Sequence, residues 1–156
     1  MTRPLDAVDR KIVALVAANG RISHEDIARR VFVSRPAVHE RVKRLEQDGV
    51  IRGYRAVVDW AAIDLGLCGL VSVQIEHQQM SQVLSKLFDI ANPRAMIEEC
   101  HRITGQWCVL LKVRAASPQA LQELLDEIHA VPGVSQLLTS IVLTSLDAQA
   151  PPTAAS

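Results

Sequence analysis

The stretch from Ser23 to Gly49 constrains the fold of this chain more than any other part of the sequence. It holds two short helical patterns joined by a tight link, and each pattern opens with a serine. A serine hydroxyl at that place accepts a hydrogen bond from a backbone N–H of the first turn that has no partner within the helix. Ser23, followed three residues later by Asp26, therefore predicts a capped helix. The residues expected to face inward on it are Ile27, Ala28 and Val31.

Ser34 opens the second helical pattern, and Pro36 is tolerated there because a first-turn N–H has no intrahelical partner to lose. We expect Phe32 and Val33 to fill the turn between the two helices. A rotation of about 100° per residue places one apolar stripe on the inward side of the second helix. That stripe consists of Val38, Val42 and Leu45. The opposite side carries Pro36, Glu40, Lys43 and Gln47, with His39 and Arg44 beside it and Arg35 at the N-terminus.

A compact helix pair with one apolar face and one basic, hydrogen-bonding face is what the major groove of DNA admits. The alternative is a charged face that is merely solvated. The charge distribution favours DNA, because residues 1–59 hold 12 Lys and Arg against 8 Asp and Glu, whereas the remainder holds 5 against 9. A basic half around a helix-turn-helix is the electrostatic footprint expected for phosphate contact. The sequence thus predicts double-stranded DNA as a partner.

Composition excludes several other classes of protein. At 156 residues and 49% hydrophobic content, the chain can bury one ordinary core or two small ones. No apolar run approaches the length of a membrane span and no signal peptide is evident, so we expect a cytoplasmic protein without a membrane partner. Cys68, Cys100 and Cys108 have neither a C-x-x-C pair nor the spacing of a zinc site. We therefore expect free thiols, no metal and no cofactor.

The segments flanking the helix pair complete an N-terminal domain. Leu5 to Asn19 predicts a first helix with Asp6 as N-cap and Asp9 at N3, and it is expected to end where Asn19 and Gly20 tolerate a left-handed conformation. Val50 to Val58 has the composition of a strand. Arg52 and Arg55 on it are either phosphate contacts or simply solvated.

The second half alternates strands and helices. Periods of two predict strands over 67–76, 95–104, 107–114 and 134–143, and helical spacing predicts helices near Met80–Phe88 and after Ser117. The order strand, helix, strand, strand, helix, strand defines a ferredoxin-like arrangement with both helices on one face of an antiparallel sheet. The predicted class is α+β, with an N-terminal three-helix, winged helix-turn-helix domain and a C-terminal ferredoxin-like βαββαβ domain.

The uncovered face of that sheet is expected to meet water or another subunit. Cys108 and Leu110 are expected on it, and apolar residues there favour a sheet-to-sheet homodimer over an ordinary strand with one stray leucine. The predicted domain bounds are 1–59 for DNA binding, 60–66 for a linker, 67–146 for effector binding and oligomerisation, and 147–156 for a disordered Pro/Ala-rich tail.

The chain resembles the Lrp/AsnC (leucine-responsive regulator/asparagine regulator) family of transcription factors. The resemblance runs from about Leu5 to Leu146 and is carried by three stretches: LDAVDRKIVALVAANGRIS, SRPAVHERVKRLEQDGVIRGYRAVVD and ITGQWCVLLKV. It implies a bacterial or archaeal regulator that dimerises through the C-terminal domain. It also implies dimers that often assemble into octamers, and a small effector, commonly an amino acid, bound between subunits.

The resemblance also implies site residues. Ser34, Arg35, Pro36, His39, Glu40 and Lys43 match the groove-facing part of the recognition helix, and Arg41 matches a characteristic arginine that either pairs with phosphate or holds the helices together. Thr104, Gly105, Gln106 and Trp107 match the family turn that lines the effector site. A threonine hydroxyl and free turn N–H groups can receive a carboxylate, although a tight hairpin alone would also require Gly105.

Cys108 departs from the family pattern, in which an aspartate usually follows the turn. A neutral thiol does not offset an ammonium group. The effector is then something other than a simple amino acid, is held by groups such as Glu98, Glu99 or His101, or is absent. A redox-sensing thiol is a further alternative.

An enzyme is the competing function, since sirohaem decarboxylases resemble this family in architecture. No paired carboxylates, nucleophile motif or phosphate loop support catalysis. His101 with Arg102 is the only hint of a tetrapyrrole site, and strand alternation sends those two side chains to opposite faces. A helix-turn-helix that no longer binds DNA is a third alternative, which the basic outward face opposes.

Overall fold

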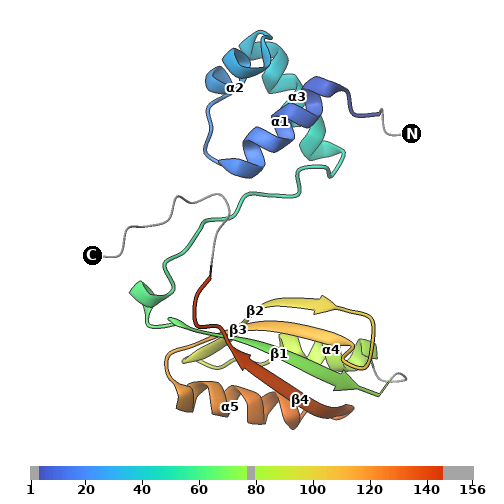
Figure 1. Ribbon diagram of the computed structural model, residues 1–156. Coiled ribbons are helices and arrows are strands. Elements are labelled where there is room, and N and C mark those ends of the chain that lie inside the picture. The colour runs from blue at the N-terminus through green and yellow to red at the C-terminus, as the bar shows by residue number, and fades with distance from the viewer. Residues whose placement is uncertain (1–3, 77–79, 146–156) are drawn as a thin grey trace. The chain divides into compact units, whose positions relative to one another are not determined.

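The computed structural model describes residues 4–76 and 80–145, and the predicted tail at 147–156 lies outside them. The chain forms two compact units, the first ending at Val57 and the second beginning at Val58. The first unit consists of three helices and the second of a four-stranded sheet with two helices (Figure 1). This is the predicted α+β class.

The three helices of the first unit are α1 (Ala7–Ala18), α2 (His24–Val31) and α3 (Arg35–Gln47). Each begins where the sequence places a capping side chain: Asp6 accepts from the Asp9 N–H, Ser23 from Asp26 and Ser34 from Ala37. The capping box at α1 is complete, because the Asp9 carboxylate also accepts from the Asp6 N–H. The predicted caps are therefore confirmed. They could be predicted because a cap depends on residues only three apart in the sequence.

One apolar core joins the three helices. Its buried residues include every side chain predicted to face inward on α2 and α3, together with Ile12 of α1 and Ile51 after α3. They are Ile12, Ile27, Ala28, Val31, Val38, Val42, Leu45 and Ile51. Burying an aliphatic side chain of this kind stabilises the fold by about 1.5–3 kcal/mol, so this core keeps the opposite side of α3 at the surface.

Three local predictions in this unit are wrong. Phe32 does not fill the turn: its backbone is left-handed, with φ 57°, and the residue is 89% exposed. The α1 C-cap Asn19 is extended rather than left-handed, and its side chain instead accepts from the Arg21 N–H at 3.0 Å. Residues 50–58 form no strand, because their backbone finds no strand to pair with in the described part of this chain.

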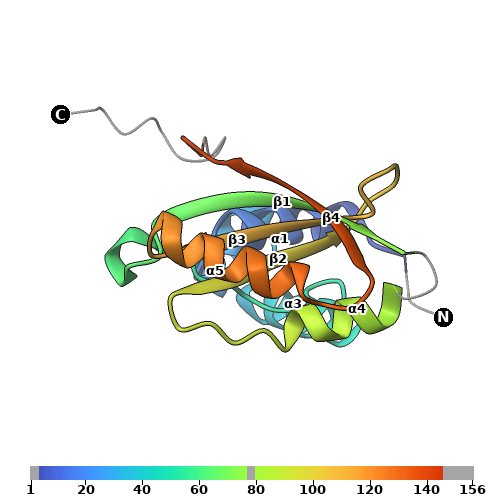
Figure 2. The same cartoon turned by 90° about the horizontal axis from the view of Figure 1, so that it is seen from below.

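The second unit contains β1 (Leu67–Ile75), α4 (Met80–Phe88), β2 (Ala95–Arg102), β3 (Val109–Ala115), α5 (Pro118–His129) and β4 (Val134–Ile141). The strand order is β2-β3-β1-β4 and all neighbours are antiparallel. Figure 2 shows α4 and α5 together on one face of this sheet. The arrangement is the predicted ferredoxin-like one. The segment predicted as a linker contains a short 3-10 turn, η1 (Ala61–Ile63), that belongs to this unit.

The core of the second unit lies between the sheet and the two helices. The alternate residues of β1 and β3 that face the helices are almost completely buried, as the period of two predicts. The sheet contributes Val71, Val73, Val109, Leu111 and Val113, and the helices contribute Val83, Leu87, Leu121, Leu124 and Ile128. Phe88, the last residue of α4, is 66% exposed although it falls in the apolar spacing of that helix.

The other face of the sheet has no helix on it. The register places Leu110 of β3, Ser72 of β1 and Leu138 of β4 in one row across this face, which we call the open face. Leu70 lies in the next row, opposite Lys112 and Ser140. Leu110 thus lies where the sequence predicted. Cys108 does not: it precedes β3, escapes the alternation and is buried in the core.

Candidate nucleic-acid interface and effector turn

The outward side of α3 is a continuous polar surface. Ser34, Arg35, Pro36, His39, Glu40 and Lys43, all predicted to face DNA, are exposed. Among the described residues, neither Arg35 nor Lys43 makes a side-chain hydrogen bond or ion pair. The Ser34 hydroxyl, by contrast, accepts from the Ala37 N–H at 3.4 Å and serves as the helix cap. Two cations and an imidazole on this surface are therefore available to a ligand.

Arg41 and Arg44 differ from the rest of the predicted set. Arg41 Nη1 lies 2.6 Å from Asp6 Oδ2 and 2.7 Å from Asp9 Oδ1, and Arg44 Nη2 lies 2.7 Å from Asp9 Oδ2. Both guanidiniums turn towards the start of α1. The Asp9 side chain is only 1% exposed, whereas those of Arg41 and Arg44 are about a quarter exposed. This cluster connects α1 to α3.

The Asp6 carboxyl has a pKa lowered from 3.8 to about 2, first by the hydrogen bond from the Asp9 N–H and then by that from Arg41. Asp6 is thus charged throughout the neutral range. The role of Asp9 was missed by sequence reasoning, which assigned it only to the helix cap. The sequence held one indication of this role: Arg41 lies beside the apolar stripe of its helix.

His24 is a second residue that sequence reasoning missed. Its ring centroid lies 5.4 Å from that of His39, so the first residue of α2 adjoins the outward side of α3. Together with Arg35 and Pro36 these rings line a depression of about 320 Å³. The N-terminal part of α3 is therefore extended by α2 into a wider polar surface.

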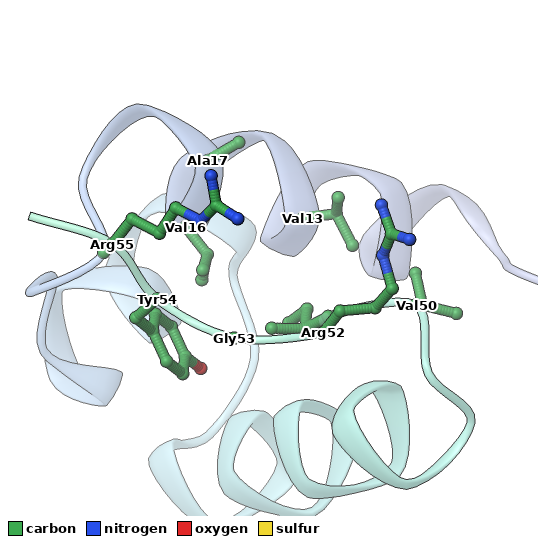
Figure 3. A pocket seen from close by; sticks show the side chains of 10 residues that line it. Val13, Val16, Ala17, Val50, Arg52, Gly53, Tyr54 and Arg55 are labelled. Atoms are coloured by element: carbon green, nitrogen blue, oxygen red, sulfur yellow. The ribbon is translucent and has the colours of Figure 1, made fainter. Parts of the chain in front are cut away.

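Arg52 and Arg55 lie on the extended segment that follows α3. This segment and α1 enclose a groove of about 890 Å³, lined on the α1 side by Val13, Val16 and Ala17 (Figure 3). Both arginine side chains leave the segment on the side of α1, while Tyr54 points the other way. The Tyr54 hydroxyl donates to Glu46 at 2.8 Å, which fixes the segment against α3.

The turn predicted to line an effector site connects β2 and β3. Thr104, Gly105 and Gln106 are exposed, Trp107 is half-buried, and Gly105 has φ +110°, a conformation that favours glycine. Cys108 lies beneath them. Its Sγ accepts from the Ile75 N–H at 3.2 Å, and its own N–H donates to Val73 O at 3.2 Å. The thiol thus serves the end of β1 rather than facing solvent, and this position disfavours the redox-sensor alternative.

A charged group occupies the β2–β3 side of the open face. Arg114 Nε lies 2.6 Å from Glu98 and its guanidinium lies over the Trp60 ring at 5.4 Å, while Lys112 Nζ lies 3.1 Å from Glu99. Hydrogen bonds from His101 and from Lys112 lower the pKa of Glu99. Glu98 and Glu99, considered as alternative effector ligands, are thus already paired. No cluster of three or more metal-binding side chains occurs in the described ranges.

The fold described above defines a class: a protein with an N-terminal helix-turn-helix unit and a separate ferredoxin-like domain. Residues 5–52 match the winged helix-turn-helix DNA-binding family, and residues 68–151 match the Lrp/AsnC ligand binding domain. The chain belongs to the Lrp/AsnC family of transcriptional regulators. Within residues 4–76 and 80–145, no helix has the length and apolar character needed to cross a membrane.

Known proteins match this chain over nearly its full length. The leucine-responsive regulatory protein of Haemophilus influenzae is 34% identical over 142 residues, covering 90% of this chain and 85% of the relative. The transcriptional regulator FL11 of Pyrococcus horikoshii is 29% identical over 143 residues, covering 92% of each. Among solved structures, LrpC of B. subtilis has a TM-score of 0.79 at 27% identity, covering 94% of this chain and 99% of that one. A regulator from Neisseria meningitidis in complex with L-Met has a TM-score of 0.82 at 25% identity, covering 95% and 97%.

Proposed function

We propose that α3 enters the major groove of double-stranded DNA and that Arg35, His39 and Lys43 contact it, with Ser34, Pro36 and Glu40 completing the surface. The observation that carries this proposal is the exposed outward side of α3, on which Arg35 and Lys43 have no partner among the described residues. Arg35 is the first residue of α3, and residues at the N-terminal end of a recognition helix are those that contact base edges.

Arg35→Ala and Lys43→Ala test this proposal in different ways. If Arg35 donates to a guanine, its loss weakens binding by about 1–3 kcal/mol and relaxes specificity at one position. If Lys43 contacts phosphate, its loss weakens binding to all duplexes about equally and lowers the slope of log affinity against log salt by about 1. Quantitative gel shifts with duplexes selected by the wild-type chain measure both effects. Unchanged affinity in both variants would refute the assignment of this surface.

We further propose that the chain acts as a homodimer formed across the open face. Leu70, Leu110 and Leu138 lie on this face, and Leu138 is 52% exposed. Apolar side chains on a sheet face with no helix to cover it match a self-complementary two-fold interface. Two-fold symmetry then predicts palindromic DNA sites with half-site centres about 34–36 Å apart, or a multiple of that distance. Assembly of dimers into octamers, as in some family members, is a further step of the same proposal.

The effector is proposed to be an amino acid or a related metabolite bound between subunits at the β2–β3 turn. Thr104 to Gln106 are exposed in one chain, so a partner subunit is needed to enclose a ligand there. The likeness to the Neisseria regulator solved with L-Met supports an amino acid. Calorimetric titration of the purified chain with each proteinogenic amino acid tests this, with Thr104→Ala as the variant expected to lose binding. Identical heats in wild type and Thr104→Ala would place the effector elsewhere.

A further inference from the structure

We propose that Asp9 is a positioning residue for DNA recognition, which sets the orientation of α3 by binding Arg41 and Arg44. The corollary is that these two arginines, although basic and on the recognition helix, are not phosphate or base contacts. This inference rests on the proposed DNA-binding role of α3. It assigns to α1 a part in recognition that goes beyond packing.

The geometry around Asp9 is that of a fully occupied carboxylate. Oδ1 accepts from Arg41 at 2.7 Å, and Oδ2 accepts from Arg44 at 2.7 Å and from the Asp6 N–H at 3.1 Å. The Asp9 side chain is 1% exposed, and burying a carboxylate this deeply is costly unless it is paired and hydrogen-bonded. Asp9 therefore holds Arg41 and Arg44 more firmly than an exposed carboxylate in a surface ion pair would.

The spacing of the two arginines converts this pairing into control of orientation. Arg41 and Arg44 are three residues apart, so they adjoin on one flank of α3 and approach one carboxylate from successive turns. Rotating α3 about its axis, or sliding it by one residue, would break at least one of the two short contacts. The apolar stripe alone permits small rotations, because packing of aliphatic side chains is not directional.

The charges in the cluster also argue against phosphate contact. Asp6, Asp9, Arg41 and Arg44 together carry no net charge, so the pair of arginines offers little attraction to a polyanion. Arg35 and Lys43 lack such counter-ions among the described residues. Basic residues of α3 thus divide into two that hold the helix and two that are free to bind.

The variant Asp9→Asn, made in the whole chain, distinguishes an effect of Asp9 on the orientation of α3 from an effect of its charge alone on DNA affinity. Removing a negative charge near DNA predicts equal or tighter binding to every duplex if charge alone matters. Loss of orientation predicts the opposite for specific sites: the ratio of affinity for a selected duplex to that for a shuffled duplex falls at least about tenfold, while affinity for the shuffled duplex is kept. The selected duplex is the one that the wild-type chain enriches from a random library.

Arg41→Ala provides the second readout, the salt dependence of binding to the shuffled duplex. We expect the salt slope of Arg41→Ala to equal that of wild type, whereas Lys43→Ala lowers the slope by about 1. Lys86→Ala, which removes an exposed charge from α4 in the other unit, is the matched control. If circular dichroism shows that Asp9→Asn loses helix content, Arg44→Lys tests the proposal instead. Lysine keeps the positive charge of Arg44 but not its planar guanidinium, so we expect the same fall in the ratio of affinities for the selected and shuffled duplexes.

Three results would overturn the proposal. One is a specificity ratio in folded Asp9→Asn, or in Arg44→Lys, that stays within about twofold of wild type, a difference too small to count as a lost base contact. Another is a reduced salt slope in Arg41→Ala, which would make Arg41 a phosphate contact. The third is failure of the wild-type chain to enrich any sequence. That result refutes the proposed DNA recognition as a whole, and so is distinguishable from the first two.

Discussion

Replacing Leu138 with alanine is expected to weaken the proposed homodimer by about 30-fold. Leu138 lies on the open face in one row with Ser72 and Leu110, and it is 52% exposed in a single chain. Complete burial of a leucine side chain contributes about 1.5–3 kcal/mol, so covering the exposed half contributes about 1 kcal/mol per copy. A two-fold interface contains the residue twice, which gives about 2 kcal/mol and about 30-fold in the dissociation constant.

Sedimentation velocity over a concentration series measures this shift directly. Phe88→Ala is the matched control, because Phe88 is also apolar and 66% exposed but lies on α4, on the face of the sheet that the helices cover. We expect Phe88→Ala to leave the dimer constant unchanged. A wild-type chain that stays monomeric at every concentration, or a Leu138→Ala dimer as tight as wild type, would refute the assignment of the interface to the open face.

Two further predictions concern the DNA-binding unit. Because the folded-state pKa of Asp6 is about 2, below its ordinary 3.8, its contribution to stability is present above about pH 4 and is lost as the pH falls towards 2. The thermal midpoint of wild type should therefore fall more between about pH 4 and 2 than that of Asp6→Ser, which keeps a capping oxygen without a charge. An equal fall in the two chains would contradict the lowered pKa of Asp6. Phe32→Gly should stabilise the chain by about 1 kcal/mol in urea denaturation, because glycine adopts φ 57° without steric cost while the lost side chain is exposed. Destabilisation would show instead that the contact between Lys11 and the Phe32 ring outweighs the backbone strain.

Features that depend on neighbours in the sequence were predictable. Asp6, Ser23 and Ser34 were assigned as caps because a cap needs only a short polar side chain and a free N–H within the next turn. The inward stripes of α2 and α3 and the alternation of β1 and β3 followed from the helical and strand periods in the same way. The helix and strand order then left few arrangements for the second unit.

Features that depend on distant partners were not predictable. The run Val50–Val58 has strand composition, but a strand requires a pairing partner that the described part of the chain does not offer. Cys108 was expected on the open face because the predicted strand began at residue 107, whereas β3 begins at Val109 and the alternation does not include Cys108. Asp9 looked like an ordinary capping residue, since Arg41 and Arg44 lie more than thirty residues away in the sequence. Each of these errors comes from treating a tertiary contact as a local one.

The candidate site shows the same division. The exposed residues of α3 were identified from its helical period, whereas His24 belongs to the surface only because α2 brings it to His39. The effector turn was identified by resemblance, and its geometry agrees with a glycine requirement at Gly105. At the proposed site between subunits, part of the ligand's surroundings would come from the partner, and local sequence patterns do not encode contacts of that kind.

Base analogues in the selected duplex test the central claim, major-groove reading by α3, most directly. Replacing a purine by its 7-deaza form removes the N7 acceptor from the major groove and leaves the minor groove unchanged. We predict that one such replacement in each half-site weakens wild-type binding by about 1–3 kcal/mol and has no effect on Arg35→Ala, which has already lost the contact. Wild-type binding that tolerates every 7-deaza replacement would contradict the claim.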